Sequence, residues 1–291
     1  MRVLILGSDT PLGQSLVTLL ERLGRHELTL LTRSACRWKS ERQAKKAVVR
    51  AKCEVVVDLR IAAAADGVDQ LQDLDLKRCH WVAKACQRSN SIYLYASSSR
   101  VFSGQLDRPY TEEDYPDNET GAGAILASAE QLVRDSCERH LILRLGPVFS
   151  WEGTNLITHM LGQLGEQGGS LVMDNNLRGC PVAAGDGARV VSALLDQLST
   201  GLDVSGIYHY CSSDTATYYE FAEALLASAS QFSQFSPNAV QLERQPEGLA
   251  PLSRALNCSK IRNTFAIKQA PWRSAIPEIV KHYYEQERKQ E

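Results

Sequence analysis

Short, fully apolar runs alternate with amphipathic stretches along the first half of the chain. The apolar runs, which we expect to be strands, are residues 3–6, 28–32, 54–59, 92–96 and 141–145. The amphipathic stretches, which we expect to be helices, are residues 11–23, 40–52, 68–88 and 122–140. Apolar runs without polar alternation are typical of parallel strands that helices cover on both faces. The pattern therefore predicts an α/β fold with a Rossmann-type doubly wound parallel sheet.

The pattern is less regular after Pro147. Helices are expected at residues 156–165, 188–198, 218–229 and 279–290, and strands at residues 171–173 and 206–210. Residues 230–252 are rich in Gln, Ser and Pro, which favours a loop. The second half thus predicts a smaller lobe that follows the sheet.

The composition excludes several classes of protein. The 291 residues carry 32 Lys+Arg against 34 Asp+Glu, so no broad basic face for nucleic acid is expected. No apolar run approaches the roughly 20 residues of a membrane-spanning helix, and residues 1–7 lack the pattern of a signal peptide. The eight cysteines show no metal-ligand spacing, so we expect free buried thiols and no metal site. These features predict a cytoplasmic protein without nucleic-acid or membrane partners.

A glycine-containing turn links the first expected strand to the first expected helix. Residues 7–13 read Gly-Ser-Asp-Thr-Pro-Leu-Gly, at the position where dinucleotide-binding folds carry a glycine-rich turn. The residues expected to contact the cofactor there are Gly7, Ser8, Thr10, Leu12 and Gly13. Thr10 replaces the middle glycine of the full pattern, but its hydroxyl and the free N–H groups of the helix start favour an anion. The alternative is a helix-capping turn without a ligand, which the charge of Asp9 favours.

The end of the second expected strand bears on the choice of cofactor. Arg33 stands there, where an arginine accommodates the 2′-phosphate of NADP and an acidic residue would bind the ribose of NAD. Asp58, Leu59 and Arg60 end the third expected strand and are expected to lie beside the adenine. NADP(H) is therefore the predicted cofactor, and NAD(H) or no cofactor at all are the alternatives.

Further motifs begin at the fourth expected strand. Residues 95–104 read Tyr-Ala-Ser-Ser-Ser-Arg-Val-Phe-Ser-Gly, and residues 108–114 read Arg-Pro-Tyr-Thr-Glu-Glu-Asp. Later motifs lie at residues 142–149, 153–155, 206–209, 219–222 and 251–260, with Trp272 downstream. In this order the motifs resemble those of the dTDP-4-dehydrorhamnose reductases, which are extended short-chain dehydrogenase/reductases. The resemblance covers essentially the whole chain.

The resemblance implies a division of the chain and a set of site residues. A dinucleotide-binding Rossmann domain is expected over residues 1–149, rejoined by about residues 186–212, and a smaller ligand-binding lobe over residues 150–291. Ser98 matches the family's catalytic serine or threonine, and Ser97 and Pro147 are expected to contact the cofactor. The residues implied for a nucleotide or nucleotide-sugar ligand are Ser98, Phe102, Asn155 and Arg178. A relative with this fold, the regulatory subunit of methionine adenosyltransferase, makes a protein partner or a homodimer a further expectation.

The sequence departs from the family at the Tyr-x-x-x-Lys pair that carries proton transfer. Thr120 and Ala124 stand in its place, and a shift by two residues that matches Glu130 gives Ala122 and Leu126 instead. A threonine hydroxyl is far less acidic than a phenol, whose pKa is about 10.

No cation is available to replace the lysine locally, because no lysine lies between Lys84 and Lys260.

Three functions are then compatible with the sequence. The first is a catalytically degenerate NAD(P)-binding protein of this family that acts as a binding or regulatory protein. The second is an active NADP-dependent sugar-nucleotide reductase or epimerase that uses Ser98 and a displaced acid such as Tyr115. The third is a protein-interaction subunit with an empty cleft.

Overall fold

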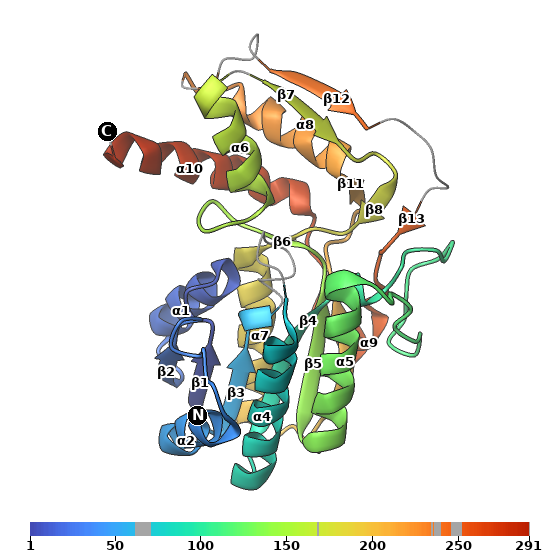
Figure 1. Ribbon diagram of the computed structural model, residues 1–291. Helices are drawn as coiled ribbons and strands as arrows, with labels where there is room; N and C mark the ends of the chain where they lie inside the picture. The colour runs from blue at the N-terminus through green and yellow to red at the C-terminus, as the bar shows by residue number, and fades with distance from the viewer. Residues whose placement is uncertain (62–70, 168, 234, 236–239, 246–251, 291) are drawn as a thin grey trace.

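The larger part of the protein is built on a six-stranded sheet of order β10-β5-β4-β3-β1-β2 (Figure 1). The computed structural model describes residues 1–61, 71–167, 169–233, 235, 240–245 and 252–290. The sheet consists of β1 (Arg2–Leu6), β2 (Glu27–Leu31), β3 (Val55–Asp58), β4 (Ile92–Ser98), β5 (His140–Leu145) and β10 (Gly206–Tyr210). Every neighbouring pair is parallel, so the predicted doubly wound sheet is confirmed.

Helices cover both faces of this sheet. On one face α1 (Pro11–Leu23) packs against α7 (Ala184–Ser199), and on the other α4 (Asp73–Ser89) packs between α2 (Glu41–Ala51) and α5 (Gly121–Ser136). The chain runs outward from β1 to β2 and then returns across β1 to β3. Right-handed crossovers in opposite directions place their helices on opposite faces. The carboxyl ends of β1 and β3 therefore mark the topological switch point, where open α/β sheets bind their ligands.

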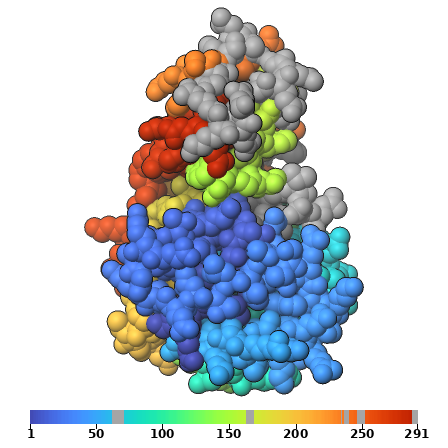
Figure 2. Space-filling view, turned by 90° about the vertical axis from the view of Figure 1, so that its left-hand side faces the viewer, coloured from blue at the N-terminus to red at the C-terminus, as the bar shows by residue number. Residues whose placement is uncertain are grey.

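The smaller lobe has a hydrophobic core of its own and lies above the sheet in Figure 1. Its helices are α6 (Leu156–Gln167), α8 (Tyr218–Ala229) and α10 (Ile276–Gln290). Its strands are β7 (Ser170–Met173), β8 (Leu177–Gly179), β11 (Ala216–Thr217), β12 (Gln241–Arg244) and β13 (Leu252–Ser253). Figure 2 shows this lobe as a narrower body on the wider sheet domain. A two-residue pair of strands, β6 (Val148–Phe149) with β9 (Val182–Ala183), lies where the two parts meet.

Some expected elements differ from the structure. The helix expected over residues 122–140 ends at Ser136, and the loop expected over residues 230–252 contains β12, which pairs in parallel with β7. Helix α9 (Ser259–Phe265) packs beside β10 and contributes to the larger core. Part of the helix expected over residues 68–88 lies outside the described residues.

Among the described helices, none combines the length and apolar character needed to cross a membrane.

Candidate functional site

The glycine turn joins β1 to the start of α1 at close range. Gly7 has a positive φ of 83°, and a Cβ atom on Gly13 would lie 2.2 Å from the carbonyl oxygen of Gly7. A glycine at position 13 therefore allows α1 to approach the turn closely. The peptide nitrogen of Leu12 belongs to the first turn of α1, where N–H groups have no partner within the helix and favour an anion.

Thr10 has a different role from the predicted one. Its side chain is fully buried, and its hydroxyl donates to Gly7 O at 2.8 Å and accepts from Gly13 N at 3.0 Å. The hydroxyl thus caps α1 and closes the turn, so the expectation that it contacts a phosphate is not supported. Ser8 is held at the end of β2, because its peptide nitrogen donates to Leu31 O at 3.2 Å.

An open cavity of about 730 Å³ lies beside this turn, at the carboxyl ends of β2 and β3. Four arginines contribute to its lining: Arg33, Arg37, Arg60 and Arg78. Arg33 was predicted to lie here, and Asp9 accepts a hydrogen bond of 2.7 Å from its peptide nitrogen. Arg37 is exposed, and its side chain has no hydrogen bond or ion pair in the described part of the chain. Sequence reasoning missed Arg37 because it lies beyond the strand end, in a segment without a periodic pattern.

Arg60 is fixed at the switch point by a buried carboxylate. The carboxylate of Asp58 is fully buried and accepts from Arg60 Nε at 2.9 Å, from Arg60 Nη2 at 2.7 Å and from Tyr93 Oη at 2.7 Å. Burial alone would raise the pKa of Asp58, but the charge and hydrogen bonds of Arg60 lower it. Asp58 and Leu59 are both buried and do not contribute to the lining of the cavity, so their predicted contact with an adenine has no support from the exposure of their side chains. Arg60 alone of these three lines the cavity.

The two serines that end β4 are also buried. Ser97 is inaccessible and donates a hydrogen bond of 2.5 Å to Glu130 Oε1, so the predicted contact with a cofactor is not supported. Ser98 is 1% exposed, and its hydroxyl accepts from the peptide nitrogen of Arg100 at 3.3 Å. Ser98 thus caps the short helix η1 (Ser99–Val101) at the edge of the second cavity described below.

The start of α5 offers neither a phenol nor an ammonium group. Thr120 is the residue that precedes the helix, and its hydroxyl lies 3.3 Å from Asn118 Oδ1. In the alternative alignment Leu126 is fully buried among apolar side chains. Tyr115, the displaced acid of the alternative active reductase, is 84% exposed. The nearest lysine in the later sequence, Lys260, donates instead to Ile207 O at 2.8 Å.

A second cavity, of about 40 Å³, lies between the sheet domain and the lobe. Pro147 and Arg178, both predicted site residues, contribute to its lining, together with Arg100, Arg254 and Tyr218. Burial and the neighbouring charge of Arg100 lower the pKa of Arg254, whose Nε atom is buried without a hydrogen-bond partner in the described residues. Converging guanidinium groups are typical of a site for phosphate or carboxylate groups. The motif at residues 251–260 contains Arg254, but the sequence alone does not assign the arginine to this cavity, because its place depends on how β13 pairs with β8.

Two other residues implied for a substrate have structural roles. Phe102 is fully buried, with its ring centroid 4.0 Å from that of Tyr110, and lies outside the described cavity lining. The amide of Asn155 donates to Glu152 O at 3.0 Å and accepts from Ile157 N at 3.0 Å, which organises the loop before α6. All eight cysteines are free and buried, and no described group of His, Cys, Asp or Glu is arranged to hold a metal ion.

The doubly wound sheet with a glycine turn at its switch point defines a Rossmann-like protein of the reductase and epimerase architecture. Residues 1–285 match the family described as the RmlD substrate binding domain, and the chain belongs to that family. A dTDP-4-dehydrorhamnose reductase from Aggregatibacter actinomycetemcomitans is 28% identical over 291 residues, which cover 96% of this chain and 98% of the relative.

Solved structures agree with this assignment at the level of the fold. A dTDP-4-dehydrorhamnose reductase from Clostridium acetobutylicum superposes with a TM-score of 0.80 at 18% identity, covering 98% of this chain and 100% of the other. The reductase of Bacillus anthracis, solved in complex with NADP, gives a TM-score of 0.77 at 18% identity, covering 97% of this chain and 98% of the other.

Proposed function

We propose that this chain binds NADP(H) and an anionic nucleotide-type ligand, and that it has lost the reductase activity of its relatives and acts as a binding or regulatory protein. The observation that carries the loss of activity is the start of α5, where neither alignment supplies the tyrosine and lysine of the family. General acid catalysis typically contributes about 10²–10⁴-fold to a rate. A reductase that lacks its proton donor is therefore expected to turn over its substrate at least about 100-fold more slowly.

The cofactor is supported by the switch point. The close approach at Gly13, the first-turn N–H of Leu12 and the arginine-lined cavity fit a dinucleotide whose adenosine half lies toward β2. Arg33 and Arg37 supply the positive charge that a 2′-phosphate needs, which favours NADP over NAD. A bound nicotinamide would supply hydride chemistry; this chain's own contribution is to hold the phosphates.

The proposal of a second ligand rests on the second cavity, between the sheet domain and the lobe, which we call the cleft. Three guanidinium groups line it, those of Arg100, Arg178 and Arg254, and the last has an unsatisfied buried nitrogen. A diphosphate would satisfy such donors. Several relatives are named as reductases of dTDP-4-dehydrorhamnose, which is a sugar linked to a nucleoside diphosphate. A nucleoside diphosphate is therefore the class of ligand that we propose for the cleft.

The test combines a binding measurement with a rate measurement. The purified chain is titrated with NADPH by calorimetry, and NADPH oxidation is followed with dTDP-4-dehydrorhamnose as substrate, with the Aggregatibacter relative as the active reference. We expect stoichiometric binding of NADPH and a turnover at least about 100-fold below the reference.

The two halves of the proposal fail separately. Turnover comparable to that of the reference enzyme would show that an unrecognised acid replaces the missing pair. Tyr218→Phe and Tyr115→Phe would then identify it, because Tyr218 lines the cleft and Tyr115 is exposed. Failure to bind NADPH would overturn the cofactor half of the proposal and would favour the alternative of a protein-interaction subunit.

A further inference from the structure

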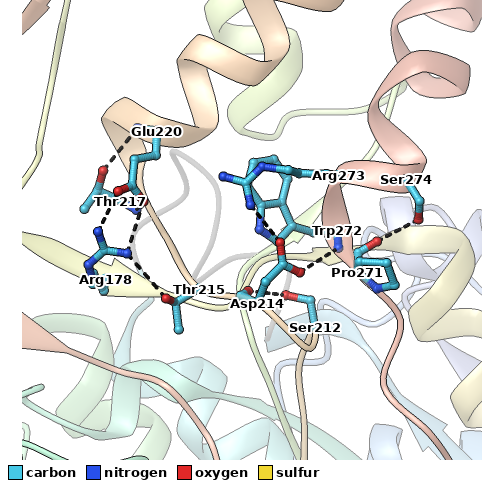
Figure 3. Close-up of polar contacts among 10 residues, drawn as sticks. All are labelled: Arg178, Ser212, Asp214, Thr215, Thr217, Glu220, Pro271, Trp272, Arg273 and Ser274. Atoms are coloured by element: carbon cyan, nitrogen blue, oxygen red, sulfur yellow. Dashed lines mark hydrogen bonds and ion pairs between the residues drawn. The ribbon is translucent and has the colours of Figure 1, made fainter.

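Arg178, one of the three arginines of the cleft, is held by a carboxylate of the lobe. Its Nη2 lies 2.5 Å from Glu220 Oε1 and its Nη1 lies 3.1 Å from Glu220 Oε2, so the contact is bidentate. A longer contact of 3.4 Å joins Nη1 to Thr215 Oγ1. Figure 3 shows the guanidinium reaching from the β8 segment to the first turn of α8, where Glu220 stands.

Glu220 is fixed independently of Arg178. Its Oε2 accepts from the peptide nitrogen of Thr217 at 3.0 Å, and its own peptide nitrogen donates to Thr217 Oγ1 at 3.1 Å. These two reciprocal bonds form the capping box of α8. The carboxylate therefore keeps its position at the helix start whether or not the arginine stays with it.

The two partners face the cleft unequally. Arg178 lines the cavity, whereas Glu220 does not, so a ligand that enters meets the guanidinium first. The side chains are 42% and 31% exposed, which leaves the pair open to exchange with another anion. The volume of about 40 Å³ is below the roughly 300–1,000 Å³ of small-molecule sites, so a diphosphate needs the lining side chains to move to be fully accommodated.

We propose that Arg178 and Glu220 form a latch in which the carboxylate competes with the ligand's phosphate for the guanidinium. A diphosphate that enters the cleft takes Arg178 from Glu220, and Glu220 remains at its cap. Glu220 thereby sets the affinity of the cleft for phosphate-bearing ligands. The inference rests on the proposed function for the cleft and adds a control of its affinity.

The exchange is favourable on general grounds. Partly exposed ion pairs contribute little net free energy, because solvent screens them and both side chains lose rotamer freedom. A guanidinium binds a carboxylate or a phosphate through two parallel bonds, and a diphosphate as a whole carries more charge than one carboxylate. Removing the charge of Glu220 therefore strengthens ligand binding, while removing the guanidinium weakens it.

The experiment measures the Kd of dTDP and of inorganic pyrophosphate by calorimetry at fixed ionic strength. Glu220→Gln removes the charge and keeps an amide oxygen for the bond from Thr217, so the cap of α8 is preserved. We expect Kd values about two- to fivefold lower than for the unaltered protein. Arg178→Gln is expected to raise them about tenfold, and the double variant is expected to match Arg178→Gln.

Asp214→Asn is the matched control. Asp214 lies in the same region (Figure 3), pairs with Arg273 at 2.8 Å and does not line the cavity. It changes the net charge by the same unit, so its Kd values are expected to equal those of the unaltered protein.

Three results would overturn the latch. They are an unchanged or higher Kd for Glu220→Gln, an equal gain for Asp214→Asn, and no binding of dTDP or pyrophosphate by any variant. NADPH titrations of the same samples test the cofactor half of the proposed function separately, because its site lies at the switch point and shares no residue with the latch.

Discussion

The carboxylate of Glu130 and the guanidinium of Arg144 form an ion pair in the interior of the sheet domain, with side chains 2% and 1% exposed. Arg144 Nη2 lies 2.6 Å from Glu130 Oε2, and Arg144 Nε lies within 3.1 Å of both carboxylate oxygens. The hydroxyl of Ser97 donates to the same carboxylate. Together with Ser97, the pair therefore ties α5 to β4 and β5.

Glu130→Gln is expected to lower the free energy of unfolding by about 3–5 kcal/mol, because it leaves the buried charge of Arg144 without its counter-charge. Urea denaturation measures the change. Glu41→Gln serves as the control, since its contact with Arg88 at 3.1 Å is exposed and is worth less than about 1 kcal/mol. A loss for Glu130→Gln no larger than that of the control would contradict the argument.

His209 adds a pH dependence to the same network. Its Nδ1 lies 3.1 Å from Tyr110 O and its Nε2 lies 3.3 Å from Arg144 Nη1. The ring therefore donates through Nδ1 and accepts through Nε2, which requires the neutral form. Burial and then the charge of Arg144 lower the pKa of His209 to about 3.

The sign of the effect on stability follows from linkage. The unfolded chain binds a proton on His209 below about pH 6.5 and the folded chain does not, so this group's contribution is complete above pH 6.5 and falls as the pH drops toward 3. His209→Gln is expected to reduce the slope of stability against pH between 6.5 and 5, by at most about 1.4 kcal/mol per pH unit. Urea midpoints at several pH values measure both slopes. Other histidines contribute to both proteins, so the difference isolates His209, and equal slopes would refute the assignment.

Two glycine substitutions test the glycine turn. A Cβ on Gly13 would lie 2.2 Å from Gly7 O, so Gly13→Ala is expected to cost about 1–3 kcal/mol and to abolish NADPH binding. A Cβ on Gly162, inside α6, would meet open space, so Gly162→Ala is expected to stabilise the protein by up to about 1 kcal/mol. Thermal unfolding and NADPH titration measure the pair. Equal effects of the two substitutions would mean that the turn does not depend on the close approach.

Local signals account for the elements that were predicted well. Helix α1 has its predicted bounds because Thr10 caps it, Pro11 takes its first position and Gly24 ends it with a φ of 63°. Of the described strands of the lobe, β7 was predicted, at residues 171–173. The others were not, because a pair such as β8 with β13 is only two residues long and joins segments far apart in the sequence. Their formation depends on tertiary pairing and leaves no periodic pattern.

The site was predictable only where a motif fixes the backbone. Gly7, Gly13 and Arg33 were located because the first βαβ unit determines where they lie. Ser97 and Phe102 share a motif with Ser99 and Arg100, which line a cavity, but are themselves buried in the core. A motif does not show which side of a strand end a side chain takes. Arg37 and Arg254 reach their cavities through packing of distant segments.

Arg37 provides the sharpest test of the cofactor. It is exposed and lines the cavity at the end of β2, and its side chain has no hydrogen bond or ion pair in the described part of the chain, so its charge is available to a 2′-phosphate. Arg37→Ala is expected to weaken NADPH binding about tenfold and to leave NADH binding unchanged, because only NADPH carries that phosphate. Calorimetric titration with both cofactors measures the ratio of the two Kd values. Lys39→Ala, which removes an exposed positive charge two residues away and outside the cavity lining, is expected to leave the ratio unchanged. Equal losses for NADPH and NADH would mean that Arg37 acts through general charge and does not recognise the 2′-phosphate.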